Sequence, residues 1–236
     1  KINVVIEPLE KKKIYYAAFF PALISFFIVL VFLFEKGMGW DFTQGGVFPR
    51  TSNTILHVFT MPFVHSGWSH LLSNTLSFFV LSTCLYYFYS EIANKVLFLS
   101  VLFSGIILWV IGRDNWHIGA SGVIFSLSFF LFFSGIIRKY APLIAIALVV
   151  VMLYGNNVWH LFPWQKFDPV SWEGHLAGAV TGILLAIFYR KKGTQRPEQA
   201  WDDQDDENPE WMEDEPTENN ENAENKEQTE QHYSLN

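Results

Sequence analysis

Cysteine is almost missing from this 236-residue chain, which contains Cys84 alone. An internal disulfide and a metal site of several thiolates are therefore excluded. Acidic residues are also scarce before the C-terminal tail. Residues 1–197 hold 8 Asp and Glu against 15 Lys and Arg. Residues 198–236 hold 15 Asp and Glu against 1 Lys. A basic, apolar body with a separate acidic tail indicates a membrane protein with a soluble appendage and argues against a nucleic-acid-binding protein.

The apolar residues, which make up 50% of the chain, gather into six candidate membrane-spanning runs. The sequence therefore predicts an all-α membrane protein, with a six-transmembrane-helix bundle over residues 14–192 and a cytoplasmic N-terminus over residues 1–13. No small-residue cleavage site follows the first run, which favours a retained helix over a signal peptide. The six predicted spans cover residues 14–34, 69–90, 96–111, 122–137, 141–158 and 174–190.

Two segments do not fit a membrane span. Residues 35–68 are too polar to cross a bilayer and rich in aromatic side chains, so we expect a long first loop that lies at the membrane interface. Residues 193–236 form an acidic tail without an apolar period, and we expect it to be disordered and cytoplasmic. Charged tails of this kind often bind a protein partner.

The basic residues predict the orientation of the spans. With the N-terminus inside, the cytoplasmic segments carry eleven Lys and Arg and the outer segments carry four. Because cytoplasmic loops are enriched in Lys and Arg, both termini are expected to be cytoplasmic. We expect a multi-pass protein of a bacterial inner membrane, whose second, fourth and sixth spans all start at the outer face.

The string Gly119-Ala120-Ser121-Gly122 stands where the fourth span begins. From Gly122 to Ile137 the apolar run would measure about 24 Å as a helix, whereas a bilayer core is about 30 Å thick. Ser121 is therefore expected below the outer surface, in a loop enclosed by protein or lining a wet cavity. Taken alone, this serine fits a helix N-cap better than a nucleophile.

Other polar residues are predicted at the same depth. His70 and Asn74 are four residues apart and share one face near the outer end of the second span. In the sixth span, His175 shares a face with Gly178 and Gly182, which allow close packing on a neighbouring helix. These residues are expected to converge with Ser121.

This combination of side chains is suited to nucleophilic catalysis. A serine needs a base, and histidine has a suitable pKa. The His70 ring, the Asn74 amide and the backbone at the start of the fourth span are candidate oxyanion donors. No carboxylate is well placed as a third member, since Glu173 lies on another face from His175 and Asp168 fits a cap of the sixth span. The pattern therefore predicts a Ser–His dyad.

At these residues the chain resembles the rhomboid family of intramembrane serine proteases. The resemblance rests on Gly119-Ala120-Ser121-Gly122, on His65-x4-His70-x3-Asn74 and on His175-x2-Gly178-x3-Gly182, in the family's order. It implies that Ser121 is the nucleophile, His175 the general base, and His70 with Asn74 part of the oxyanion site. Gly119, Gly122, Phe125 and Gly178 are implied as supporting residues.

The resemblance also implies that Phe125 takes the place of an aromatic residue that packs on the catalytic histidine. It further implies that the fifth span is a lateral gate and that the substrates are transmembrane proteins with small residues at the cut. Where the family often has Trp-Arg in its first loop, this chain has Leu56-His57. We expect contact with membrane lipid but not with nucleic acid, and we expect no cofactor.

Three other interpretations remain. A zinc site at His65, His70 and His175 is disfavoured by their spacing and by the lack of an HExxH glutamate. A transporter is disfavoured because no repeated halves are found. A catalytically inactive rhomboid-like binder of transmembrane helices is the alternative to an enzyme. We interpret the other histidines of the body as structural, namely His57, His65, His117 and His160.

Overall fold

The computed structural model describes residues 8–142 and 171–193, together with the single residues 144, 145, 148, 161 and 195. The chain divides into two compact units, Lys1–Arg196 and Pro197–Asn236. The second unit, which holds most of the predicted acidic tail, lies outside the described residues. Most of the predicted fifth span, and with it the predicted lateral gate, lies outside them too.

The described part of the chain is helical, as the apolar runs predict. In that part strands are absent, apart from one isolated antiparallel bridge between Val47 and His117. Short 3₁₀ turns occupy the first loop, at η1 (Thr43–Gly45), η2 (Ser52–Val58) and η3 (Met61–Phe63). The α-helices are α1 (Pro8–Met38), α2 (Trp68–Phe88), α3 (Ala93–Ile111), α4 (Ser121–Arg138) and α6 (Trp172–Phe188).

These five helices overlap five of the six predicted spans. By length and composition α1, α2, α3 and α4 can cross a membrane, and α6 is a shorter apolar helix of 17 residues. Large apolar side chains cover their outer faces, and Phe26, Leu76 and Leu184 are all more than half exposed. An exposed apolar surface of this extent is typical of a protein that faces lipid rather than water. The fold is that of an all-α membrane bundle.

The start of α1 differs from the prediction. The apolar run begins at Ile14, but the helix already begins at Pro8. Lys11, Lys12 and Lys13 are too polar for the lipid core, yet lysine is a good helix former. The helix therefore continues past the end of its apolar part.

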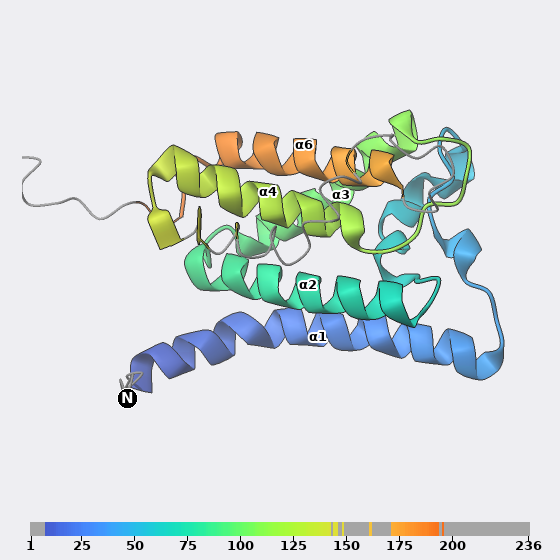
Figure 1. The fold of residues 1–236 in the computed structure, drawn as a ribbon, viewed down its shortest axis with the longest axis horizontal. Coiled ribbons are helices and arrows are strands. Elements are labelled where there is room, and N and C mark those ends of the chain that lie inside the picture. Colours follow the sequence, from blue (N-terminus) through green and yellow to red (C-terminus); the bar gives the residue numbers. More distant parts are fainter. Residues whose placement is uncertain are drawn as a thin grey trace, which may run out of the picture. The chain divides into compact units, whose positions relative to one another are not determined.

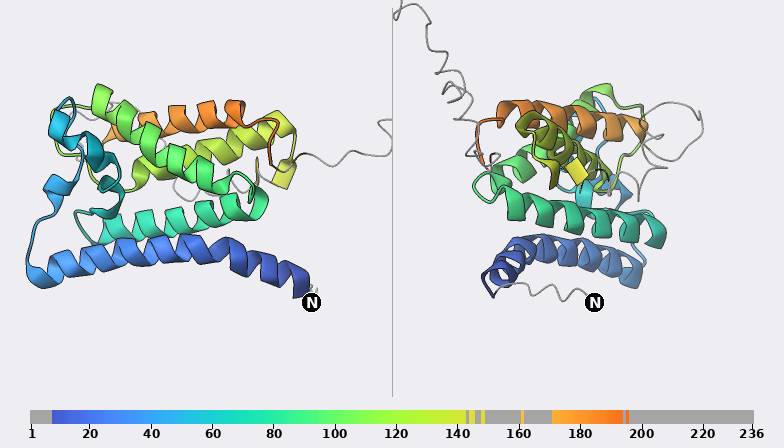
Figure 2. Two further views of the ribbon diagram at one scale, coloured as in Figure 1. Left: turned by 180° about the vertical axis from the view of Figure 1, so that it is seen from behind. Right: turned by 60° about the vertical axis from the view of Figure 1, so that its left-hand side comes forward.

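Helix α4 is the central helix of the described bundle. In α4, 12 of the 18 residues are buried, a larger share than in the apolar parts of α1, α2 and α3. It packs against α2, α3 and α6, while α1 packs along α2 in every view (Figures 1 and 2). Ser121, at the start of α4, therefore lies where three helices can contribute side chains.

Glycines on α6 allow close contact with α4. A Cβ atom at Gly178 would collide with the carbonyl group of Gly122, and one at Gly182 would collide with the backbone of Ser126 and Phe130. Because each contact is with backbone, no side-chain rearrangement can make room for a larger residue. The predicted close-packing face of the sixth span is this interface.

Hydrogen bonds hold the first loop against its neighbours, without the family's Trp-Arg pair. His57 Nδ1 bonds the carbonyl oxygen of Gly46 at 2.9 Å. Trp109 Nε1 on α3 donates to the carbonyl of Thr51 at 3.1 Å, and Arg50 Nη1 donates to the carbonyl of Gly112 at 2.6 Å. Here His57 supplies an internal contact, and Arg50 ties the loop to the segment that follows α3.

At the opposite end of the bundle, Arg138 joins the ends of α4 and α6. Its guanidinium is buried, and Nη2 donates to the carbonyls of Tyr189 at 2.5 Å and Lys192 at 2.7 Å. The same guanidinium lies over the ring of Tyr89, 5.0 Å from its centroid. The last carbonyls of a helix lack partners within the helix, and Arg138 supplies one for the C-cap residue Tyr189 as well as one for Lys192 beyond the helix.

Candidate active site

Ser121 is the first residue of α4 and does not cap it. The N-cap residue is Ala120, which makes no side-chain capping bond. Ala120 and Gly122 are buried, whereas Ser121 is partly exposed. The serine hydroxyl therefore stands at the positive end of a helix, at the edge of the packed core.

The turn before Ser121 lies directly against α2. Gly119 has a φ of +98°, and a Cβ there would be 2.7 Å from Cε1 and Nε2 of His70 and 3.0 Å from Nδ2 of Asn74. Its amide donates to the carbonyl of Met61 at 2.9 Å. Only glycine suits this conformation and this space, so the first glycine of the string brings the serine turn to His70 and Asn74.

Asn74 is buried, and its side chain is oriented by His65. The Asn74 amide nitrogen donates to His65 Nε2 at 3.1 Å, which leaves the His65 proton on Nδ1, 3.4 Å from the carbonyl of Phe63. Burial lowers the pKa of His65 to about 4, and the neighbouring His70 contributes to the shift. His65 is thus a neutral acceptor that fixes one N–H of Asn74.

His70 is half-buried beside this pair. Its ring meets that of His65 edge to face at 4.9 Å between centroids, and Nδ1 lies 3.2 Å from Ser66 Oγ. With Ser66 at Nδ1, the Nε2 side of the ring faces the Gly119 turn. The ring is therefore held where Nε2 can act on a group bound near Ser121.

His175 lies in the first turn of α6 and is buried. Its ring stacks on Phe125, with 4.3 Å between centroids and 16° between planes. Phe125 is one helical turn after Ser121, as the family resemblance implies for this aromatic residue. A Cβ at Gly122 would lie 3.2 Å from the carbonyl oxygen of Gly174. The first turns of α4 and α6, which carry Ser121 and His175, are therefore in direct contact.

Glu173, the acidic residue next to His175 in α6 that the structure describes, has other partners. Glu173 is buried, and its carboxylate is 3.7 Å from Arg113 Nε and 3.5 Å from Ser171 Oγ. The predicted cap at Asp168 is wrong, because the N-cap of α6 is Ser171, whose Oγ accepts from the Gly174 amide at 3.1 Å. Asp168 itself lies outside the described residues.

Zinc binding finds no support in this geometry. Among the described residues no three His, Cys, Asp or Glu side chains gather in the way a metal ion requires. His65 instead accepts from Asn74, and His175 packs on Phe125. The arrangement offers a hydroxyl, an imidazole and a fixed amide donor, which suits acyl transfer better than metal binding.

His65 and His117, which the sequence interprets as structural, both make hydrogen bonds near the candidate site. His65 Nε2 accepts from the Asn74 amide at 3.1 Å, and His117 Nδ1 lies 2.7 Å from Ser171 Oγ at the cap of α6. The nine-residue spacing from His65 to Asn74 was available as a signal. The contact between His117 and Ser171 joins residues 54 positions apart, and no local pattern indicates it.

Comparisons with known proteins agree with the resemblance. The profile of the Rhomboid domain matches residues 52–192. An uncharacterized protein of Mycobacterium tuberculosis is 32% identical over 177 residues, which are 68% of this chain and 70% of that protein. An uncharacterized protein of Mycobacterium leprae is 28% identical over 174 residues, 68% of this chain and 66% of its own length. A protein of Acanthamoeba polyphaga mimivirus with a provisional rhomboid name is 26% identical over 163 residues, 60% of this chain and 80% of its own.

Proposed function

Because the chain belongs to the rhomboid family of integral membrane proteins, we propose that it is an intramembrane serine endopeptidase. It cleaves other membrane proteins in or near their transmembrane segments. The observation that carries the proposal is the contact between the first turns of α4 and α6. There His175 stacks on Phe125, one turn after Ser121.

In the proposed reaction Ser121 Oγ attacks the carbonyl carbon of the scissile peptide bond. His175 takes the hydroxyl proton as the general base and then gives it to the leaving amine. A water molecule next attacks the acyl-enzyme, and its proton returns through His175 to Ser121 Oγ. Water must therefore reach Ser121, which is consistent with the partial exposure of this residue.

The oxyanion of the tetrahedral intermediate needs fixed donors. We assign this role to the Asn74 amide, the His70 ring and the backbone at the start of α4. The contacts of Gly119 with His70 and Asn74 support the assignment, since they bring these two side chains to the turn that holds Ser121. The positive end of α4 adds a favourable field for the developing negative charge.

The charge distribution supports the proposed topology. With both termini in the cytoplasm, the ends of α2, α4 and α6 that carry the candidate residues face the outer side of a bacterial inner membrane. Substrates would then be transmembrane proteins cut toward that side. The acidic tail would lie in the cytoplasm, where a protein partner can bind it.

Covalent labelling tests the proposal directly. A serine-directed fluorophosphonate is added to detergent-solubilised wild-type protein and to Ser121→Ala, and the labelled residue is identified by mass spectrometry. The same proteins and His175→Ala are assayed on a model transmembrane substrate. Label at Ser121, together with loss of cleavage in both variants, is expected, because nucleophile and base act as a unit.

An inactive binder of transmembrane helices would give a different result. It would leave Ser121 unlabelled and cut no substrate, while the wild-type protein still melts cooperatively. Cleavage by Ser121→Ala at a rate near that of the wild type would also refute the proposed dyad.

A further inference from the structure

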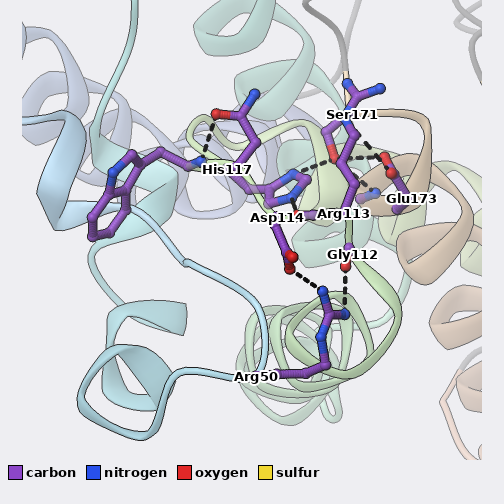
Figure 3. A network of polar contacts seen from close by, with 10 residues as sticks. Arg50, Gly112, Arg113, Asp114, His117, Ser171 and Glu173 are labelled. Atoms are coloured by element: carbon purple, nitrogen blue, oxygen red, sulfur yellow. Dashed lines mark hydrogen bonds and ion pairs between the residues drawn. The ribbon is translucent and has the colours of Figure 1, made fainter. Parts of the chain in front are cut away.

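The loop that leads to Ser121 and the start of the helix that carries His175 are joined by polar side chains. His117 lies four residues before Ser121, and Ser171 lies four residues before His175. Figure 3 shows the side chains of Arg113 and His117 in this loop pointing toward those of Ser171 and Glu173 at the start of α6. The two halves of the proposed dyad are therefore linked outside the dyad itself.

The first link is an ion pair between Arg113 and Glu173. Arg113 Nε lies 3.7 Å from Glu173 Oε1, and the Glu173 side chain is 3% exposed (Figure 3). A buried carboxylate is costly unless a cation or hydrogen bonds compensate it. Glu173 therefore holds Arg113, and with it the start of the loop, close to the first turn of α6.

The second link is a chain of hydrogen bonds through His117. Its Nε2 donates to the carbonyl of Arg113 at 3.0 Å, so Nδ1 of the neutral ring accepts from Ser171 Oγ at 2.7 Å. The same Ser171 oxygen accepts from the Gly174 amide and caps α6. His117 thereby fixes the rotamer of the capping serine.

The backbone of His117 is fixed as well. Its amide donates to the carbonyl of Val47 at 2.8 Å, and its carbonyl accepts from the Val47 amide at 2.9 Å. The first loop thus braces the residue that contacts the cap of α6. Movement of His117 would require that both backbone bonds and both ring contacts adjust.

We propose that Arg113, His117, Ser171 and Glu173 are positioning residues that set the distance between the nucleophile and the base. Together these four residues are named the dyad clamp. The inference rests on the proposed function, and it adds residues that touch neither substrate nor the reacting atoms. A displacement of about 1 Å in a reacting group can cost on the order of 10²-fold in rate, so a clamp at this place controls turnover.

The first experiment removes the charge of Glu173 and keeps its shape. Glu173→Gln is compared with Asp114→Asn, which removes an acidic charge from the loop that carries Arg113. Asp114 pairs with Arg50 and is exposed, so it is a matched control outside the clamp. We expect Glu173→Gln to lower kcat about tenfold or more with KM within threefold of the wild type, while Asp114→Asn retains both.

The second experiment uses the hydroxyl of Ser171. Ser171→Ala removes the group that bonds His117 and caps α6, whereas Ser171→Thr keeps a hydroxyl. We expect kcat to fall in the first variant and to recover in the second. The double variant Glu173→Gln with Ser171→Ala is expected to lose less than the product of the single losses, because both changes release the same clamp.

Hydrogen–deuterium exchange gives a readout that does not depend on catalysis. In Glu173→Gln, amide exchange is expected to rise in residues 113–120 and 171–176 together, and to stay unchanged in Asp114→Asn. If the wild type cleaves and Glu173→Gln cleaves with the same kcat, the clamp is refuted while the proposed function stands.

If the wild type neither cleaves nor labels at Ser121, the proposed function is refuted and exchange alone decides the clamp. Unchanged exchange in both segments then overturns it, and a joint rise supports it as a coupling between the loop and α6.

Discussion

Asn74 is a fixed donor because its neighbours leave it little freedom. Its amide nitrogen donates to His65 Nε2 and lies against the turn at Gly119. With one N–H directed at His65, the second N–H is the one left for the proposed role as an oxyanion donor. A side chain held in this way loses little entropy when it stabilises a transition state, which is the basis of preorganised electrostatic catalysis.

Replacement of Asn74 by Ala is expected to lower kcat by about 10²–10³-fold, the usual cost of one oxyanion donor. The loss should be smaller where His70 and the backbone compensate, and smaller than in Ser121→Ala. Cleavage of a model substrate in detergent measures it, with thermal melting as the check on folding. Asn94→Ala is the matched control, since Asn94 accepts from Tyr86 at an exposed site. Turnover by Asn74→Ala within twofold of the wild type would contradict the assignment.

The lowered pKa of the buried His65 side chain predicts how the free energy of unfolding depends on pH. Burial, with a contribution from His70, lowers the pKa of His65 from 6.5 to about 4 in the folded protein. Between these two values the unfolded chain binds a proton at His65 that the folded chain does not bind. The contribution of neutral His65 to the free energy of unfolding is therefore full above pH 6.5, and this contribution is lost as the pH falls toward 4.

The variant His65→Gln isolates this effect, because glutamine can still accept from Asn74 but cannot be protonated. The melting temperature of the wild type is expected to fall more between pH 7 and pH 5 than that of the variant. Some dependence should remain in His65→Gln, since burial also lowers the pKa of His117. Equal falls in the two proteins would show that His65 does not control the acid sensitivity.

At the scale of elements, the contact between α4 and α6 tolerates no added volume. In Gly178→Ala the new methyl group meets the carbonyl of Gly122, which cannot move without moving Ser121. Overpacking of this kind costs about 1–3 kcal/mol, and α6 is expected to shift away from α4. Both the melting temperature and kcat should therefore fall.

Val180→Ala is the matched control for Gly178→Ala, because Val180 is exposed on the outer face of the same helix. Its effect is expected to stay within about 0.5 kcal/mol, as for surface substitutions. If Gly178→Ala melts and cleaves like the wild type, the close contact between α4 and α6 is not required.

The helices could be predicted from the sequence, but the polar contacts between side chains of distant segments could not. A backbone in lipid must satisfy its own hydrogen bonds, so apolar runs alone located α2, α3, α4 and α6. The stacking of Phe125 on His175 followed from the family resemblance and from a spacing of one helical turn. The sequence predicts a cap at Asp168, whereas the N-cap of α6 is Ser171, whose Oγ accepts from the Gly174 amide. Its further contact with His117 comes from a distant loop, which no local pattern indicates.

At the scale of the whole molecule, the acidic tail is predicted to be separable from the helix bundle and its proposed activity. Residues 198–236 contain no apolar period that could pack on a helix bundle, and the first compact unit ends at Arg196. A protein truncated after Arg196 is expected to cleave a model substrate in detergent at the rate of the full chain. A tenfold loss of activity on truncation would show that the tail contributes to catalysis.

The buried Arg138 also has a mechanical consequence. A force that pulls on the chain from its C-terminal side reaches α6 through Lys192 and Tyr189, whose carbonyls accept from Arg138 Nη2. These two bonds carry the load before any turn of α6 does. Extraction of the protein from that side must therefore break the Arg138 junction first, and His175, at the far end of α6, is the last part of the helix to leave its place.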